Sequence, residues 1–206
     1  MNAMQLRRTA VIAGLIVAAF VGSLMVTAQA LGDPPAYTAK GELQFPKDYR
    51  RWVYLSSGYN MSYAASQMPG MSVFDNVFVD PKAYAAFEAT GTWPDKTVMA
   101  LEPRLGETGS INTAGRFQTN RLGLEVHVKD TARFAGGWAF FTFDGDGPGQ
   151  LLPSDQPCYA CHAAHAAVDN TFVQFYPTLK PIAAAKGTFS ASYLADEAKA
   201  KAAAQH

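Results

Sequence analysis

The segment Cys158-Tyr159-Ala160-Cys161-His162 is the stretch around which the rest of this chain has to fold. Two thiols three positions apart, followed at once by a histidine, form the attachment motif of a c-type haem: the thiols bond to the haem vinyl groups and the histidine ligates the iron. The sequence has two cysteines, so no other thiol competes for this role. The motif predicts one covalently attached haem c per chain, with His162 as the proximal ligand.

Two other uses of the cysteine pair are weaker. A structural zinc site needs further Cys or His ligands at matching spacing, and the sequence has none. A redox-active disulfide between Cys158 and Cys161 is expected at the start of a helix near the beginning of a βαβ unit. Here the pair lies late in the chain and is followed directly by histidine, which favours haem attachment.

The N-terminus has the pattern of a secretory signal peptide. Arg7 and Arg8 precede an apolar run at 10–26, and Ala28-Gln29-Ala30 fits a small-x-small cleavage site. An uncleaved membrane anchor is the alternative, because a run of this length lies at the short end of a membrane span. We expect cleavage and export to the periplasm, which agrees with covalent haem because that bond is made after translocation.

Composition and length fit a single haem domain. Seventeen basic residues balance seventeen acidic ones, so the net charge gives no indication of nucleic-acid binding. Aromatic residues make up 12% of the chain, which suits a large flat cofactor. We expect four segments: a signal peptide at 1–30, an extended arm at 31–47, the haem domain at 48–182 and a C-terminal tail at 183–206 that is frayed.

The segments before the motif predict mainly β-structure. β-Branched and aromatic residues predict strands at 73–79, 97–101 and 138–143. Strict alternation of apolar and polar residues predicts a fourth strand from Leu122 to Val128. Its polar side, which includes His127, is expected to face solvent.

Fewer helices are expected than strands. Asp80-Pro81 predicts the start of a short helix at 83–89, because Asp caps a helix and Pro suits its first position. A second short helix is expected at 163–168. Residues 106–115 are rich in Gly, Thr, Ser and Asn and predict a loop.

No methionine follows the haem motif, whereas electron-carrying c-type cytochromes usually have a sixth-ligand methionine there. A methionine ligand would have to be Met61, Met68, Met71 or Met99. We therefore expect a five-coordinate haem whose open distal face binds or transforms a small molecule. The expected distal wall draws on Phe74, Phe78, Phe140, Phe143 or Met71.

Several further motifs together resemble the cytochrome P-460 family, which includes the cytochromes called c-prime-beta. In order around the haem motif they are Val77–Tyr84, Trp93–Thr97, Gly136–Phe141 and Phe172–Pro177. The resemblance covers nearly the whole haem domain. It implies a mainly β (α+β) fold, an antiparallel sheet with a few helices that packs the haem on one face, and a homodimer.

The resemblance implies one of two functions. In true P-460 members a lysine is bonded to the haem macrocycle and the enzyme oxidises hydroxylamine. Lys96 is the candidate for this link, because it occupies a turn position that would suit glycine better than lysine. Lys82 is the weaker alternative. The c-prime-beta relatives lack the link, carry aromatic residues over the distal face of the haem, and bind nitric oxide and carbon monoxide. We predict a hydroxylamine-oxidising enzyme that passes electrons to another cytochrome; the alternatives are a gas-binding protein and a plain electron carrier.

Hydroxylamine oxidation removes protons as well as electrons, so it calls for a general base near the iron. In the hydroxylamine-oxidising relatives this carboxylate lies shortly before the haem motif. Asp155 is the nearest acid here, followed by Asp146 and Asp144. His165, one turn after His162, is expected at the surface.

Overall fold

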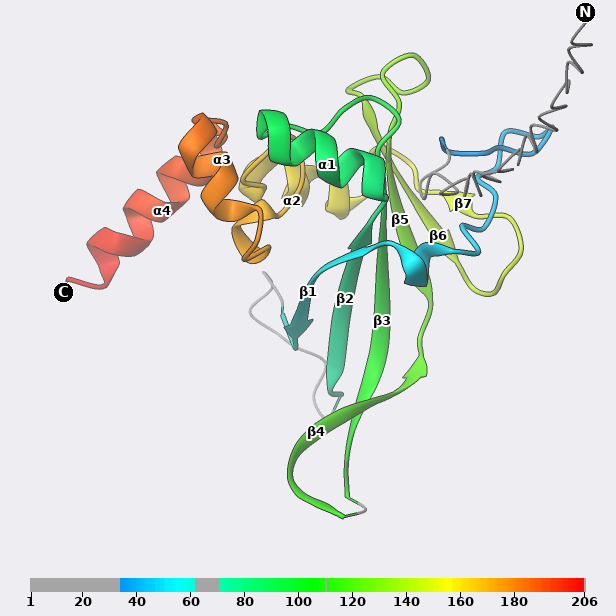
Figure 1. Ribbon diagram of the computed structural model, residues 1–206, viewed down its shortest axis with the longest axis horizontal. Helices are drawn as coiled ribbons and strands as arrows, with labels where there is room; N and C mark the ends of the chain where they lie inside the picture. The colour runs from blue at the N-terminus through cyan, green and yellow to red at the C-terminus, as the bar shows by residue number, and fades with distance from the viewer. Residues whose placement is uncertain (1–33, 62–70, 110, 206) are drawn as a thin grey trace, which may run out of the picture.

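A computed structural model describes residues 34–61, 71–109 and 111–205. Its centre is a seven-stranded antiparallel sheet in the order β1-β2-β3-β5-β6-β7, with β4 paired to β3 off this path (Figure 1). This confirms the mainly β, antiparallel fold expected from the sequence. The strands are β1 Val53–Tyr59, β2 Val73–Val79, β3 Val98–Gly109, β4 Asn112–Arg121, β5 Leu124–Lys129, β6 Trp138–Phe143 and β7 Gln150–Leu151.

The helices gather at one end of the sheet, and the hairpin of β3 and β4 extends beyond the opposite end (Figure 1). None of the helices described is long and apolar enough to cross a membrane. Their bounds are α1 Pro81–Thr90, α2 Pro157–His165, α3 Lys180–Lys186 and α4 Ala191–Ala203, with short 3-10 turns η1 at Tyr49–Arg51 and η2 at Val173–Phe175.

The sheet buries a different core on each face, because side chains alternate along a strand. One core contains Val98, Ala100, Val126 and Phe141, and the arm at 34–47 covers it. Leu43 of the arm is only 2% exposed and bridges to Gly149. The arm is therefore part of the core as well as an entry to the domain.

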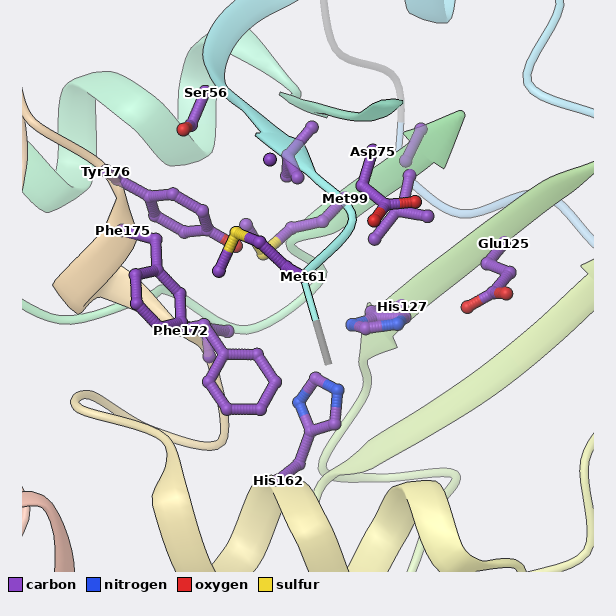
Figure 2. Close-up of a pocket in the computed structure, with 15 residues that line it drawn as sticks. Ser56, Met61, Asp75, Met99, Glu125, His127, His162, Phe172, Phe175 and Tyr176 are labelled. Carbon is purple, nitrogen blue, oxygen red and sulfur yellow. The ribbon is translucent and has the colours of Figure 1, made fainter. Parts of the chain in front are cut away.

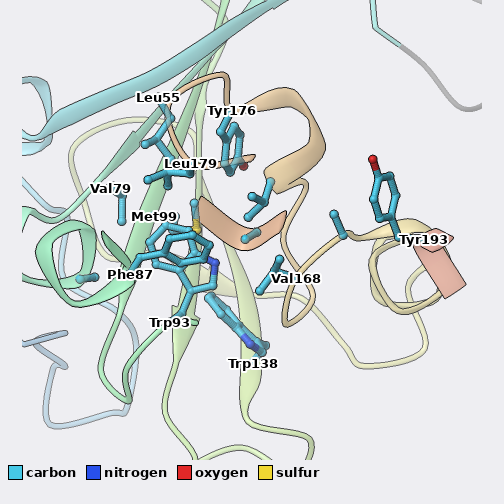
Figure 3. Close-up of a cluster of buried hydrophobic side chains, with 14 residues drawn as sticks. Leu55, Val79, Phe87, Trp93, Met99, Trp138, Val168, Tyr176, Leu179 and Tyr193 are labelled. Atoms are coloured by element: carbon cyan, nitrogen blue, oxygen red, sulfur yellow. The ribbon is translucent and has the colours of Figure 1, made fainter. Parts of the chain in front are cut away.

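The second core lies on the opposite face and joins the sheet to the helices (Figure 3). Phe87 of α1 packs on Trp93 with ring centroids 4.3 Å apart. The indole Nε1 of Trp93 donates a hydrogen bond of 2.7 Å to Thr171 Oγ1. These buried contacts hold α1 and the segment after α2 against one face of the sheet.

Several local expectations were wrong. Residues 106–115 are not simply a loop, because β3 and β4 pair through most of this segment as a long hairpin. The helix expected at 163–168 begins earlier, at Pro157, and contains the haem motif. The tail forms α4, which begins where the Ser190 side chain accepts a hydrogen bond from Tyr193 N. The expected signal peptide and its cleavage site lie outside the described residues.

Candidate haem site

Helix α2 carries the complete attachment motif. Cys158 and Cys161 lie three positions apart, on one side of this helix, and both thiols are free and partly buried. Burial, assisted by the neighbouring Cys158, raises the pKa of the Cys161 thiol. The motif is therefore presented on one rigid element, as attachment at two points requires.

His162 is held in the form that a metal ligand needs. Its Nδ1 lies 2.7 Å from the carbonyl oxygen of Asn170, and because a carbonyl only accepts, Nδ1 carries the proton. The lone pair is then left on Nε2. Burial lowers the pKa of His162, which keeps the ring neutral. A neutral imidazole with a free Nε2 is the donor that haem iron takes from a proximal histidine.

A cavity of about 220 Å³ begins at His162 (Figure 2). The sheet forms one part of its lining, and a cluster of aromatic residues after α2 forms another. Figure 2 shows His162 reaching into the cavity from α2, with the aromatic rings on one side and the carboxylates of Asp75 and Glu125 on the other. The lining includes Met61, Asp75, Met99, Glu125, His127, Phe172, Phe175 and Tyr176.

These residues fit a c-type haem. Cys158 and Cys161 would hold it by thioether bonds, and His162 would ligate the iron beside a mainly apolar space. Within 34–61, 71–109 and 111–205, no group of three or more His, Cys, Asp or Glu side chains could hold a metal ion.

His127 lies in the cavity, so its expected exposure to solvent was wrong. Its ring centroid is 4.8 Å from that of His162 and 4.3 Å from that of Phe140. Burial, and to a lesser extent the neighbouring His162, lowers the pKa of His127 well below its usual value. The alternation along β5 separates its two faces correctly, but α2 lies over the polar face at His127, while Glu125 on the same face is exposed.

Two carboxylates that the sequence did not single out as bases line the cavity. Asp75 comes from β2 and Glu125 from the polar face of β5. Burial raises the pKa of Asp75. Glu125 is exposed on its strand, but the chain around its carboxyl group partly desolvates that group; this desolvation raises the pKa of Glu125, and the nearby Asp75 raises it further. A carboxyl group in a cleft with a raised pKa is suited to exchange protons near neutral pH.

The acids expected to act as bases lie elsewhere. Asp155 is exposed in the turn before α2 and is not among the residues that line the cavity. Asp144 and Asp146 are exposed in the turn after β6, where Asp146 pairs with Arg121 at 3.0 Å. The structure therefore does not bring any of the three to His162.

Lys96 is also placed away from the cavity. Its φ of +67° lies in the left-handed region that favours glycine, as the turn pattern indicated. Its ammonium group pairs with Asp130 and lies 3.7 Å from Asp95. The side chain faces a separate hollow, which it shares with Lys82 of α1.

The aromatic wall differs from the expected one. Phe78 and Phe143 belong to the core on the opposite face of the sheet, so their expected place in the distal wall was wrong. Phe140 does lie beside His162, at 4.7 Å between ring centroids. Phe140 is not among the residues that line the cavity; the aromatic residues of the lining come from 172–176, a segment quoted above only as a family motif.

Two of the four candidate methionines line the cavity. Met99 is 3% exposed on β3, and Met61 follows the end of β1. Met71 is not among the lining residues, and Met68 lies outside the described residues.

His165 is partly exposed, and its Nδ1 lies 2.7 Å from Asp196 of α4. The pair joins the haem helix to the C-terminal helix.

Comparison with known proteins agrees with this geometry. A search of curated proteins found no match. The family model described as cytochrome P-460 matches residues 46–173, a range that includes all seven strands and α2. Members of that family carry a c-type haem, with which the pair Cys158 and Cys161 agrees. The match confirms the resemblance drawn from the motifs: this chain belongs to the cytochrome P-460 family.

Proposed function

We propose that this protein oxidises hydroxylamine at a haem c bound to α2, without the lysine link of the true P-460 members, and passes the electrons to another cytochrome. The observation that carries the proposal is the placement of Asp75 and Glu125, two carboxyl groups with raised pKa, in the cavity that begins at His162. A gas-binding site has no need of a proton acceptor, whereas an oxidation that releases protons does.

The haem, when bound, supplies an iron that binds the substrate nitrogen and takes up its electrons. Cys158 and Cys161 fix the haem to α2, and His162 presents Nε2 because its Nδ1 is engaged by Asn170. The chain thus sets both the position of the cofactor and the orientation of its proximal ligand.

Glu125 is the proton acceptor in this proposal. It lies two positions before His127 on the same face of β5, which places it beside the ring that contacts His162. Asp75 adds to the raised pKa of Glu125, so the ionisation of the two carboxyl groups is coupled. In the proposal these two residues take the role that the sequence assigned to Asp155.

Apolar side chains form much of the cavity lining near His162. Phe172 and Phe175 face the cavity from one side and Met99 from the sheet (Figure 2). Such a surface suits the flat, largely apolar body of a haem.

A second candidate is a protein of the c-prime-beta type that binds nitric oxide and carbon monoxide without turnover. The aromatic cluster at the cavity and the pairing of Lys96 with Asp130 favour it, because the resemblance gives those relatives aromatic residues over the haem and no lysine link. Export to the periplasm and a homodimer are parts of both candidates, and they rest on the signal-peptide pattern and on the resemblance.

The test is to add hydroxylamine to the ferric holoprotein with an electron-accepting dye under anaerobic conditions. Steady reduction of the dye supports the enzyme. Binding of nitric oxide by the ferrous protein with no reduction of the dye supports the second candidate and contradicts the first.

A further inference from the structure

A tight turn beside the haem helix supplies the carbonyl group that binds His162. Val168 and Thr171 exchange two backbone hydrogen bonds, of 2.8 and 3.2 Å, around the two residues between them. These are Asp169 and Asn170, with φ of +48° and +57°. Two successive residues with positive φ define a type I′ turn, and Asp and Asn are among the residues that tolerate it.

The sheet holds this turn through the side chain of Asp169. Lys129 of β5 forms an ion pair with Asp169 Oδ2, and Trp138 of β6 donates from its indole Nε1 to Asp169 Oδ1 at 3.2 Å. Lys129 and Trp138 are direct partners in the pairing of β5 with β6. The Lys129 ammonium group also donates to the Trp93 carbonyl oxygen at 2.7 Å.

This cluster is more enclosed than an ordinary surface ion pair. The side chain of Lys129 is 17% exposed, that of Asp169 29%, and Trp138 is 4% exposed. Exposed pairs contribute little because water and salt screen them, but both partners here are largely shielded and both carboxylate oxygens are used.

We propose that Lys129 and Trp138 are positioning residues for the proximal ligand, which act through Asp169. By fixing the turn they hold the Asn170 carbonyl oxygen on the Nδ1 proton of His162. A strong acceptor at this proton makes the imidazole a better electron donor to the iron, and this favours the ferric state. The inference rests on ligation of the haem by His162, and it is independent of the substrate.

The experiment uses the holoprotein and the variants Lys129→Met and Trp138→Phe. Two properties are measured: the midpoint reduction potential, by redox titration, and the iron–histidine stretching frequency of the ferrous protein, by resonance Raman spectroscopy. We expect both variants to shift the potential to more positive values and the frequency to lower values. Lys129→Arg keeps the charge and should restore both properties toward wild type.

Arg121→Gln is the matched control, because it removes an ion pair with Asp146 in a different part of the sheet. It should leave potential and frequency unchanged. An equal shift in this control would overturn the proposal, since the effect would then follow from any lost ion pair. If Lys129→Met does not fold, the test rests on Trp138→Phe, because this variant removes the indole donor to Asp169 and keeps an aromatic ring.

The proposal would also be overturned if folded Trp138→Phe and Lys129→Met both kept the wild-type reduction potential and iron–histidine frequency. Neither readout involves hydroxylamine, so failure of this proposal and failure of the proposed activity are separate results.

Discussion

Asp75 on β2 raises the pKa of Glu125 on β5, although strand β3 lies between the two strands. Both side chains project from the same face of the sheet into the cavity at His162. Desolvation, and to a lesser extent this electrostatic coupling, gives the proposed base a pKa above the ordinary 4.5 of a glutamate, and the coupling makes its ionisation depend on a second residue.

The pH dependence of turnover should report this coupling. Glu125 accepts a proton only when it is ionised, so hydroxylamine oxidation should rise with pH through its raised pKa. Asp75→Asn removes the like charge, which lowers the pKa of Glu125 and moves the rise to lower pH. Turnover measured against pH for the wild type and Asp75→Asn checks this; a rise at the same pH in both proteins contradicts the coupling.

Met61 is not expected to ligate the iron. It lines the cavity but is 45% exposed, and a five-coordinate haem leaves the distal position open. Met61→Leu should therefore keep the ferric absorption spectrum, and the ferrous wild type should bind carbon monoxide. Met71→Leu, a change outside the cavity lining, is the control. A wild type that does not bind carbon monoxide, with binding gained in Met61→Leu, would identify Met61 as the sixth ligand.

Lys96→Ala should leave the haem spectrum unchanged, because the Lys96 ammonium group pairs with Asp130 away from the cavity. It should lower the free energy of unfolding, since the Asp130 carboxylate is 6% exposed and loses a partner. Lys82→Ala, at an exposed position of α1, should change neither property. Mass spectrometry of protease-treated holoprotein gives the direct check: haem joined to a peptide that contains Lys96 contradicts the expectation.

The hydrogen bond from Trp93 to Thr171 should contribute to stability. Trp93→Phe removes the indole donor from a buried pair and should lower the free energy of unfolding by about 1–3 kcal/mol, measured by denaturant titration. Trp52→Phe, in a partly buried residue packed on the other core, should cost less. Equal losses in the two variants would show that aromatic volume, rather than the hydrogen bond, decides the effect.

Sequence patterns predicted the elements whose signals are local. The strand at 138–143 was found with its observed bounds because an aromatic run follows a Gly-Gly turn. The start of α1 was found from Asp80, whose side chain accepts from Ala83 N. The hairpin of β3 and β4 was missed because a Gly- and Thr-rich segment pairs as a strand only when a partner lies alongside.

The site residues also divide into those with a local sequence signal and those that only the fold brings together. The haem motif at 158–162 can be recognised from its residue types and their spacing alone. Alternation along β5 placed Glu125 and His127 on one face, but it does not tell which face of a sheet a helix will cover. Asp155 was favoured for its nearness in sequence to the motif, whereas the sheet brings Asp75 to the cavity from a strand far earlier in the chain.

The most direct test of the proposed function compares wild type with Glu125→Gln in anaerobic assays that contain hydroxylamine and an electron-accepting dye. The variant keeps the shape of the side chain but cannot accept a proton as a carboxylate does. We predict steady dye reduction by the wild type and a loss of about 100-fold or more in the variant, with carbon monoxide binding by the ferrous haem unchanged in both. Equal turnover in the two proteins, or no turnover in the wild type, would contradict the proposal.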